Sequence, residues 1–131
     1  MVYWKVGSRW HANGDKKNNV LDVFLQNSLV FVKERNTYGR FLREVRIGDV
    51  IAIADGFKIV ASGIVVSTPS YLRQFSLSLP ARTNDFFDYN EERDETVAVK
   101  IKIKDVNKNL VYKHRGAFCR ILDPVVQAQL P

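Results

Sequence analysis

The sequence has little cysteine and little histidine. Its 131 residues include one cysteine, Cys119, and two histidines, His11 and His114. A single thiol has no partner for an internal disulfide, and these three side chains are too few for a zinc cluster with Cys and His ligands. We therefore expect no metal, no cofactor and no redox chemistry.

Long apolar runs are absent as well. No stretch approaches the roughly 18 to 20 residues that cross a bilayer. Residues 1–10 lack the basic region followed by an apolar region that marks a signal peptide. We expect a cytoplasmic protein that does not contact membranes.

The chain also lacks the motifs of the common enzyme classes: G-x-x-x-x-G-K-[ST], G-x-G-x-x-G, H-E-x-x-H and G-x-S-x-G. Ser8, His11 and Asp55 are the residue types of a nucleophilic triad, but polar loop residues of these kinds occur in any protein of this size. Cys119 lies in a strand-like run, where a small buried thiol is the usual arrangement. We therefore expect a binding protein rather than an enzyme.

The composition fits one folded domain. Hydrophobic residues make up 46% and charged residues 26% of the chain, and a typical domain has about 100 to 150 residues. We expect residues 1–131 to form a single domain. Lys and Arg number 20 against 14 Asp and Glu, a formal net charge of +6, which favours an anionic partner, with nucleic acid ahead of a membrane surface.

Hydrophobic periodicity predicts many strands and two short helices. Helical spacing of apolar residues covers residues 19–27 and 38–45, with Asn18 or Asn19 as the N-terminal cap of the first. The predicted strands cover residues 2–6, 29–32, 50–54, 57–66, 96–104, 110–113 and 117–122. In 96–104, valine and isoleucine alternate with lysine, which predicts a strand that is buried on one face. This order of elements predicts an α+β domain whose mixed sheet curls into a small β-barrel with inserted short helices, because a Rossmann sheet needs regular strand and helix alternation.

Turn residues add local detail. Asp55-Gly56 predicts a two-residue hairpin with a type I′ turn, centred on these two residues. Gly63 predicts a bulge or a close approach of two backbones. The acidic residues 85–95 predict a solvated loop, and Asp123-Pro124 marks the end of the ordered pattern.

Positive charge is concentrated in two segments. Residues 33–46 hold five basic side chains and residues 100–120 hold seven. We expect Arg40, Arg43, Lys100 and Lys102 to contact phosphates. Arginine pairs with phosphate through two parallel hydrogen bonds, which favours this assignment. The lysines can equally solvate the outer face of a strand and protect its edge.

Aromatic residues near the N-terminus offer planar surfaces. Stacking is worth roughly 1 to 3 kcal/mol per base, and turning a base out of a helix costs a few kcal/mol. Tyr3 and Trp4 alternate in a predicted strand and fit the core. Trp10 lies in a polar loop and is the stronger candidate for stacking on a base.

The order of several short motifs resembles a known family. YWKV at 3–6, VKERN at 32–36 leading into RFLREVRIGDV at 40–50, and IVASGIV at 59–65 resemble the EVE-type domains of the PUA-like superfamily over about the first half of the chain. The resemblance implies a small β-barrel around a pocket and recognition of modified bases in DNA or RNA. In some members it serves a modification-dependent restriction system, which implies a separately encoded effector protein.

The resemblance and the residue chemistry together predict a base-binding pocket. Its expected residues are Ser8, Arg9, Trp10, Arg35, Asn36 and Asp55. Trp10 would stack on the base, and Asn36 and Asp55 would bond its edge, while Arg35 joins Arg40 and Arg43 at phosphates. The Gly48-Asp49 pair is expected to be structural, through turn geometry and amide capping.

Other functions stay open at the level of sequence. A PUA-like module for structured RNA or tRNA would depend on 2′-hydroxyl groups. A small enzyme acting on nucleotides or RNA through the same pocket would show turnover. A protein interaction domain with merely solubilising basic faces would lack the salt-dependent oligonucleotide binding that phosphate contacts produce.

Overall fold

The protein is described by a computed structural model covering residues 1–10, 18–33, 42–81, 83, 86–114 and 116–131. Within these residues one mixed sheet has the order β2-β6-β4-β3-β1-β8, with β5 paired to β6 and β7 paired to β4. Its strands are β1 (Tyr3–Gly7), β2 (Leu29–Lys33), β3 (Val50–Asp55), β4 (Lys58–Val65), β5 (Ser70–Tyr71), β6 (Thr96–Asp105), β7 (Leu110–Val111) and β8 (Phe118–Arg120). Short helices are α1 (Leu21–Asn27), α3 (Tyr89–Glu92), α4 (Pro124–Gln127) and the 3-10 turn η1 (Leu72–Gln74).

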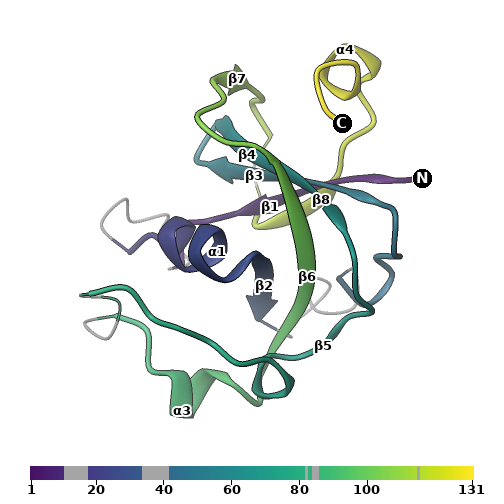
Figure 1. Ribbon diagram of the computed structural model, residues 1–131. Coiled ribbons are helices and arrows are strands. Elements are labelled where there is room, and N and C mark those ends of the chain that lie inside the picture. Colours follow the sequence, from purple (N-terminus) through teal and green to yellow (C-terminus); the bar gives the residue numbers. More distant parts are fainter. Residues whose placement is uncertain (11–17, 34–41, 82, 84–85, 115) are drawn as a thin grey trace.

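The sheet is curled, and the long, bent β6 runs through the middle of the molecule (Figure 1). β1 runs parallel to β3, with Tyr3 beside Val50, whereas its other neighbour β8 is antiparallel. The α+β, barrel-like fold expected from the sequence is confirmed. No helix in the described part of the chain is long and apolar enough to cross a membrane.

The first predicted helix is confirmed as α1. The N-cap position is held by Val20, which has no side-chain cap, and this corrects the predicted cap at Asn18 or Asn19. Asn19 still bonds the first turn, because its Oδ1 accepts a hydrogen bond from the backbone N–H of Leu21 at 2.8 Å. Of the second predicted helix, Leu42 and Arg43 have helical backbone, and its apolar residues Leu42 and Val45 are fully buried. Residues 38–41 lie outside the described residues.

The hairpin between β3 and β4 is present, but its turn is shifted by one residue. Asp55 pairs with Lys58, so the central residues are Gly56 and Phe57. Gly56 has a φ of +62°, and Phe57 is not among the residues with positive φ. Glycine at the first central position belongs to a type II′ turn, which corrects the predicted type I′ turn centred on Asp55 and Gly56.

Gly63 marks a bulge and a close approach, as predicted. The register between β4 and β6 shifts between Ser62 and Gly63. A Cβ atom at Gly63 would lie 2.7 Å from the carbonyl oxygen of Lys102. Only glycine lets the two backbones come this close.

Two segments predicted to be irregular form short helices. Part of the acidic segment is α3, capped by Asp88, whose Oδ1 accepts from the N–H of Asn90 at 3.0 Å. The Asp123-Pro124 pair begins α4, with Asp123 Oδ1 accepting from the N–H of Val125 at 2.9 Å. The predictions were wrong at these two places because an aspartate that caps the first turn favours the start of a helix. In α4 the proline in the first turn favours it as well.

The core has a large and a small part. The large cluster includes the first half of β6, which is buried on both faces, and the aromatic side chains of Trp4, Phe24, Phe31 and Phe87. The small cluster joins Ile121 and Val126 to the other face of β3. Farther along β6, Lys102 and Lys104 are exposed while Ile101 is buried, which confirms the alternation predicted from the sequence.

Candidate nucleic-acid interface

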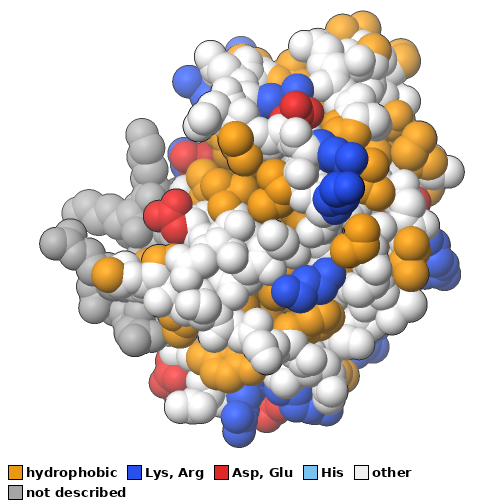
Figure 2. Space-filling model, viewed as in Figure 1, with side chains coloured by type: hydrophobic (Ala, Val, Ile, Leu, Met, Phe, Trp, Pro, Cys, Tyr) orange, Lys and Arg blue, Asp and Glu red, His pale blue; other side chains and the backbone are white. Residues whose placement is uncertain are grey.

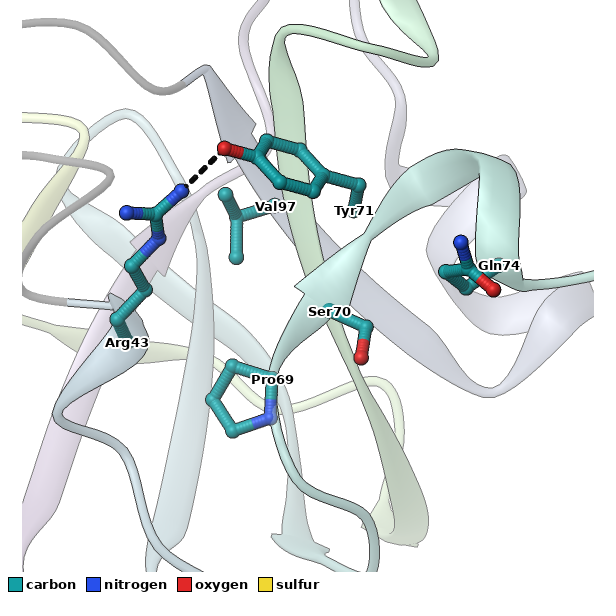
Figure 3. A pocket seen from close by; sticks show the side chains of 6 residues that line it. All are labelled: Arg43, Pro69, Ser70, Tyr71, Gln74 and Val97. Atoms are coloured by element: carbon teal, nitrogen blue, oxygen red, sulfur yellow. Dashed lines mark hydrogen bonds between the residues drawn. The ribbon is translucent and has the colours of Figure 1, made fainter.

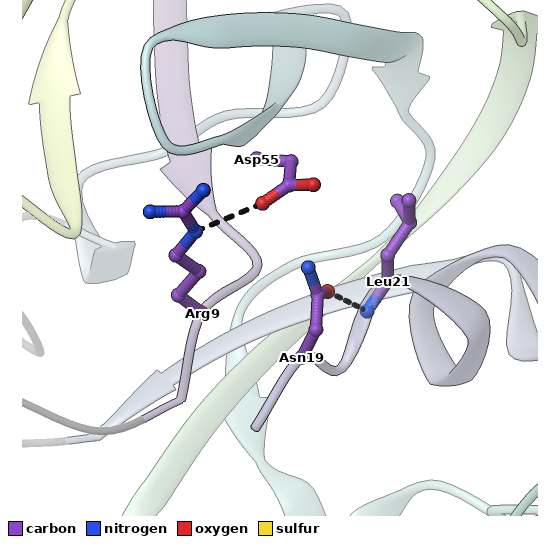
Figure 4. Close-up of polar contacts among 4 residues, drawn as sticks. All are labelled: Arg9, Asn19, Leu21 and Asp55. Carbon is purple, nitrogen blue, oxygen red and sulfur yellow. Dashed lines mark hydrogen bonds and ion pairs between the residues drawn. The ribbon is translucent and has the colours of Figure 1, made fainter. Parts of the chain in front are cut away.

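The loop after β1 meets the β3–β4 hairpin through an ion pair. Arg9 Nε lies 2.9 Å from Asp55 Oδ1 (Figure 4). The guanidinium of Arg9 covers the turn, because a Cβ atom at Gly56 would lie 2.8 Å from it. Arg9 and Asp55, both predicted for the base pocket, are therefore brought together, and each satisfies the other's charge.

Ser8 is fully buried beside them. Its N–H donates to the carbonyl of Ala54 at 2.8 Å, and its carbonyl accepts from the N–H of Val20 at 2.8 Å. Within the described part of the chain its hydroxyl has no hydrogen-bond partner. The backbone of Ser8 thus fixes the loop, and a role for its hydroxyl in ligand binding stays a prediction.

Trp10 belongs to an aromatic cluster. Its ring makes edge contacts with Phe31 and Phe87, at centroid distances of 5.2 and 5.1 Å. Lys33 Nζ lies 5.7 Å from the Trp10 ring centroid and 2.9 Å from Glu92 Oε2. Trp10 is half-buried in this setting, and its expected stacking on a base stays a prediction.

Trp4 is core, as expected. It is 3% exposed and stacks on Phe118 at a centroid distance of 5.0 Å. Three residues predicted for the site, Arg35, Asn36 and Arg40, lie outside the described residues.

Arg43 meets an aromatic residue that the sequence analysis did not single out. Its guanidinium donates a hydrogen bond to the hydroxyl of Tyr71, and its Cζ lies 5.3 Å from the Tyr71 ring centroid. Arg73 Cζ lies 4.9 Å from the same centroid. Two guanidinium groups therefore hold one tyrosine ring.

Two adjoining clefts border this tyrosine. The first, of about 400 Å³, is lined by Arg43, Pro69, Ser70, Tyr71, Gln74 and Val97 (Figure 3). The second, of about 540 Å³, is lined by Arg43, Val45, Arg46, Ile47, Thr68 and Pro69. Because Arg43 and Pro69 line both, we treat them as one surface and call it the arginine groove.

The arginine groove and Trp10 lie on different faces of the sheet. Val97 pairs with Val32 on β2 and with Tyr71 on β5, so these three side chains share a face. Phe31, which contacts Trp10, is the neighbour of Val32 and points to the opposite face. The structure thus brings Ser8, Arg9 and Asp55 near one another but does not bring Arg43 to them.

The two predicted phosphate-binding lysines differ in their surroundings. Lys100 is half-buried, and its Nζ donates to the carbonyl of Asn27 at 3.0 Å, at the C-terminal end of α1. Lys102 is exposed. Basic side chains gather over β6 on the face seen in Figure 2, so both a phosphate contact and a solvating role stay open for Lys102.

The acidic segment contacts cations near the arginine groove. Arg73 Nη1 lies 2.9 Å from Asp94 Oδ1, and the N–H of Arg73 donates to the carbonyl of Arg93 at 3.2 Å. Tyr71 and Arg73 were not predicted as site residues, because residues 67–82 follow neither the helical nor the strand period. Their signal is an aromatic residue two positions before an arginine, which is too common to interpret alone.

Cys119 lies away from these surfaces, opposite Lys5 in the β1–β8 pair. Lys5 is 3% exposed, and its Nζ donates to the carbonyls of His114 and Gly116 at 2.6 and 2.9 Å. Burial lowers the pKa of Lys5. Burial also raises the pKa of the Cys119 thiol, and this effect outweighs the positive charge of Lys5, which acts to lower that thiol pKa. A raised thiol pKa disfavours a nucleophilic role.

No set of three or more His, Cys, Asp or Glu side chains in the described ranges is placed to hold a metal ion. No family model and no curated protein matches the chain. Among solved structures, the fold is similar to a hypothetical protein from Leishmania major, with a TM-score of 0.42 and 18% sequence identity over 82% of this chain and 70% of that one. This likeness carries no functional argument.

Proposed function

We propose that this chain is a nucleic-acid-binding module and that the arginine groove is its contact surface. One observation carries the proposal: two clefts of ligand size share Arg43, with Arg46 in one and Tyr71 in the other. Binding sites for small ligands typically measure about 300 to 1,000 Å³. A binding role, rather than catalysis, fits a groove built from guanidinium, aromatic and apolar groups.

The chemistry of the groove suits an anionic, base-bearing ligand. Arg43 and Arg46 are exposed and offer planar forks of N–H donors, which match phosphate oxygens. The net charge of +6 attracts a polyanion over a longer range. Tyr71, Pro69 and Val97 add apolar and aromatic surface that a free phosphate would not use.

Recognition of a modified base is the finer form of this proposal. It is supported by the resemblance of the first half of the chain to EVE-type, PUA-like domains. Ser8, Arg9 and Trp10, from the segment after β1, and Asp55, at the end of β3, would then read the base. A cytoplasmic location and a separately encoded effector protein belong to the same hypothesis.

The test is fluorescence anisotropy with labelled DNA and RNA oligonucleotides, with and without single modified bases, at about 50 and 200 mM salt. We expect salt-sensitive binding that the double variant R43A/R46A weakens for every oligonucleotide. A plot of the logarithm of its binding constant against the logarithm of salt concentration should become shallower, by about 0.7 to 0.9 in slope for each phosphate contact removed. K58A/K113A is the matched control, since it also removes two exposed cations, neither of which lines the groove.

Binding that does not respond to salt, or equal losses in R43A/R46A and K58A/K113A, would overturn the proposal. A preference for one modified base that survives the higher salt would support the finer form. Loss of binding on replacing ribose with deoxyribose would identify RNA as the ligand, because only RNA carries the 2′-hydroxyl.

A further inference from the structure

We infer that the Tyr71 end of the arginine groove receives one unpaired nucleobase, so that the module prefers single-stranded nucleic acid to duplex. This inference rests on the proposed function and assigns it a ligand class. It also places base stacking at Tyr71, on the other face of the sheet from Trp10.

The Tyr71 ring is held in place before any ligand binds. Arg43 bonds its hydroxyl, so this guanidinium sits at the edge of the ring (Figure 3). Arg73 Cζ lies 4.9 Å from the ring centroid but does not line the cleft. The ring therefore borders the cleft while Arg73 supports it from outside. An aromatic side chain fixed in this way loses little conformational freedom when a base stacks on it.

The other lining residues suit a base rather than a phosphate. Pro69 and the buried Val97 are apolar and provide walls for a flat ring. The hydroxyl of Ser70 and the amide of Gln74 can each donate and accept hydrogen bonds. A nucleobase edge presents both donors and acceptors, so these two groups can bond it whichever pattern it has.

The adjoining cleft suits the backbone that carries this base. Arg46 and Thr68 line it with a guanidinium and a hydroxyl, both donors to phosphate oxygens. Arg43 stands between the two clefts and contributes to both. Along the groove, the Tyr71 ring comes first, the shared Arg43 second, and the phosphate donors of the second cleft last. In a single strand a base is likewise followed by the phosphate of its backbone, so one nucleotide can contact these groups in turn.

A duplex does not fit this arrangement without disruption. Its bases are already paired and stacked, and taking one out costs a few kcal/mol. A single strand offers its bases at little cost, and stacking on an aromatic side chain tolerates any sequence because every base has a π face. The groove should therefore discriminate by strandedness more than by sequence.

The experiment compares an unstructured oligo-dT of about 12 nucleotides with a hairpin duplex of equal charge, using wild type, Y71A, Y71F, Q74A and R43A/R46A. We expect wild type to prefer the single strand. Y71A should weaken single-strand binding roughly 5- to 150-fold, the range that stacking on one aromatic side chain provides. Duplex binding should change little, and Y71F, which keeps the ring, should retain most of the preference.

A second readout is independent of affinity. A 2-aminopurine placed in the oligonucleotide should lose fluorescence on binding to wild type and Y71F but not to Y71A. The exposed Gln74 can be changed with little effect on folding, and Q74A should weaken single-strand binding alone, so the inference stays testable if Y71A does not fold.

The outcomes separate the two proposals. One contrary outcome is that Y71A and Q74A lose affinity for single strand and duplex equally. Another is that neither variant loses affinity while R43A/R46A still does. Either outcome would overturn the single-strand inference and leave the proposed nucleic-acid binding standing. No salt-sensitive binding of wild type to either oligonucleotide would overturn both.

Discussion

The indole nitrogen of Trp4 donates a hydrogen bond to Oδ2 of Asp49 at a distance of 3.0 Å. The same carboxylate accepts from the backbone N–H groups of Val2 and Arg46, at 3.0 and 2.9 Å. Asp49 is 4% exposed. One buried carboxylate thus ties the start of β1 to the segment that carries Arg43 and Arg46, which confirms the structural role expected for Gly48-Asp49.

Asp49→Asn should destabilise the fold near neutral pH. In Asp49 both carboxylate oxygens accept hydrogen bonds. An asparagine has one acceptor oxygen and an NH₂ group in place of the other, so at least one of the bonds to the charged carboxylate is lost. The expected loss is about 1.5 to 3 kcal/mol of unfolding free energy, measured by urea unfolding. Asp22→Asn, at an exposed site in the first turn of α1, is the control and should change stability much less.

The same carboxylate predicts a pH dependence. Burial acts to raise the pKa of Asp49, but the hydrogen bonds from Trp4, Arg46 and Val2 outweigh it and lower the pKa below its usual value. The folded state therefore binds its proton less readily than the unfolded state, whose pKa is about 3.9. The stabilisation is present above about pH 3.9 and is lost as the pH falls through the folded-state pKa. Asp49→Asn should flatten this acid limb, and an unchanged limb would contradict the assignment.

Sequence reasoning succeeded where local patterns decide the structure. The alternation of valine, isoleucine and lysine predicted β6, and the apolar spacing predicted α1. The hairpin turn was misplaced by one residue because both Asp55 and Gly56 suit a tight turn, and the strand pairing that chooses between them is a tertiary contact. Short helices such as α3 and α4 depend on a few capping bonds that carry no periodic signal.

The candidate site was less predictable than the fold. Arg43 was found from charge, but its partner Tyr71 comes from a segment without periodicity and reaches Arg43 only because β5 pairs with β6. Trp10 lies outside the strands and helices, as predicted from its polar neighbours in sequence. Its packing against Phe31 and Phe87 joins residues far apart in the chain, which no local pattern shows.

Gly63→Ala should be strongly destabilising compared with Gly7→Ala. At Gly63 a Cβ atom would lie 2.7 Å from the backbone oxygen of Lys102, so β4 and β6 must separate. At Gly7 the nearest atom would be 3.6 Å away, an ordinary contact. Thermal unfolding should show a loss of about 1 to 3 kcal/mol for Gly63→Ala and much less for Gly7→Ala. Equal effects would mean that the close approach does not constrain this position.

Cys119 should react slowly with iodoacetamide in the folded protein. Burial raises the pKa of its thiol, and the charge on Lys5 offsets this only in part. The thiolate is the reacting form. At a pH equal to the ordinary thiol pKa, about 8.5, alkylation should therefore be slower in the folded protein than in the unfolded protein. Lys5→Met removes the offsetting charge and should slow it further, at a pH where the variant remains folded. Faster alkylation in Lys5→Met would contradict the assigned electrostatics.

Asp94→Asn should increase affinity for oligonucleotides. Asp94 pairs with Arg73, the residue that supports the Tyr71 ring, and a phosphate near this edge must compete with the carboxylate. Exposed ion pairs are worth about 0.2 to 1 kcal/mol, which corresponds to a gain of roughly 1.4- to 5-fold in affinity. The gain should be largest at low salt, because screening weakens the exposed pair as ionic strength rises.

Glu91→Gln is the matched control, since it removes the same charge from an exposed side chain of the neighbouring α3. If only the total charge of the protein mattered, both variants would bind oligo-dT equally well. A larger gain in Asp94→Asn, abolished when Arg73 is also changed to alanine, would show that the effect passes through the Arg73 pair. That result would make the acidic segment a competitor for the same cations that the nucleic acid uses, and it would place the edge of the binding surface at Arg73.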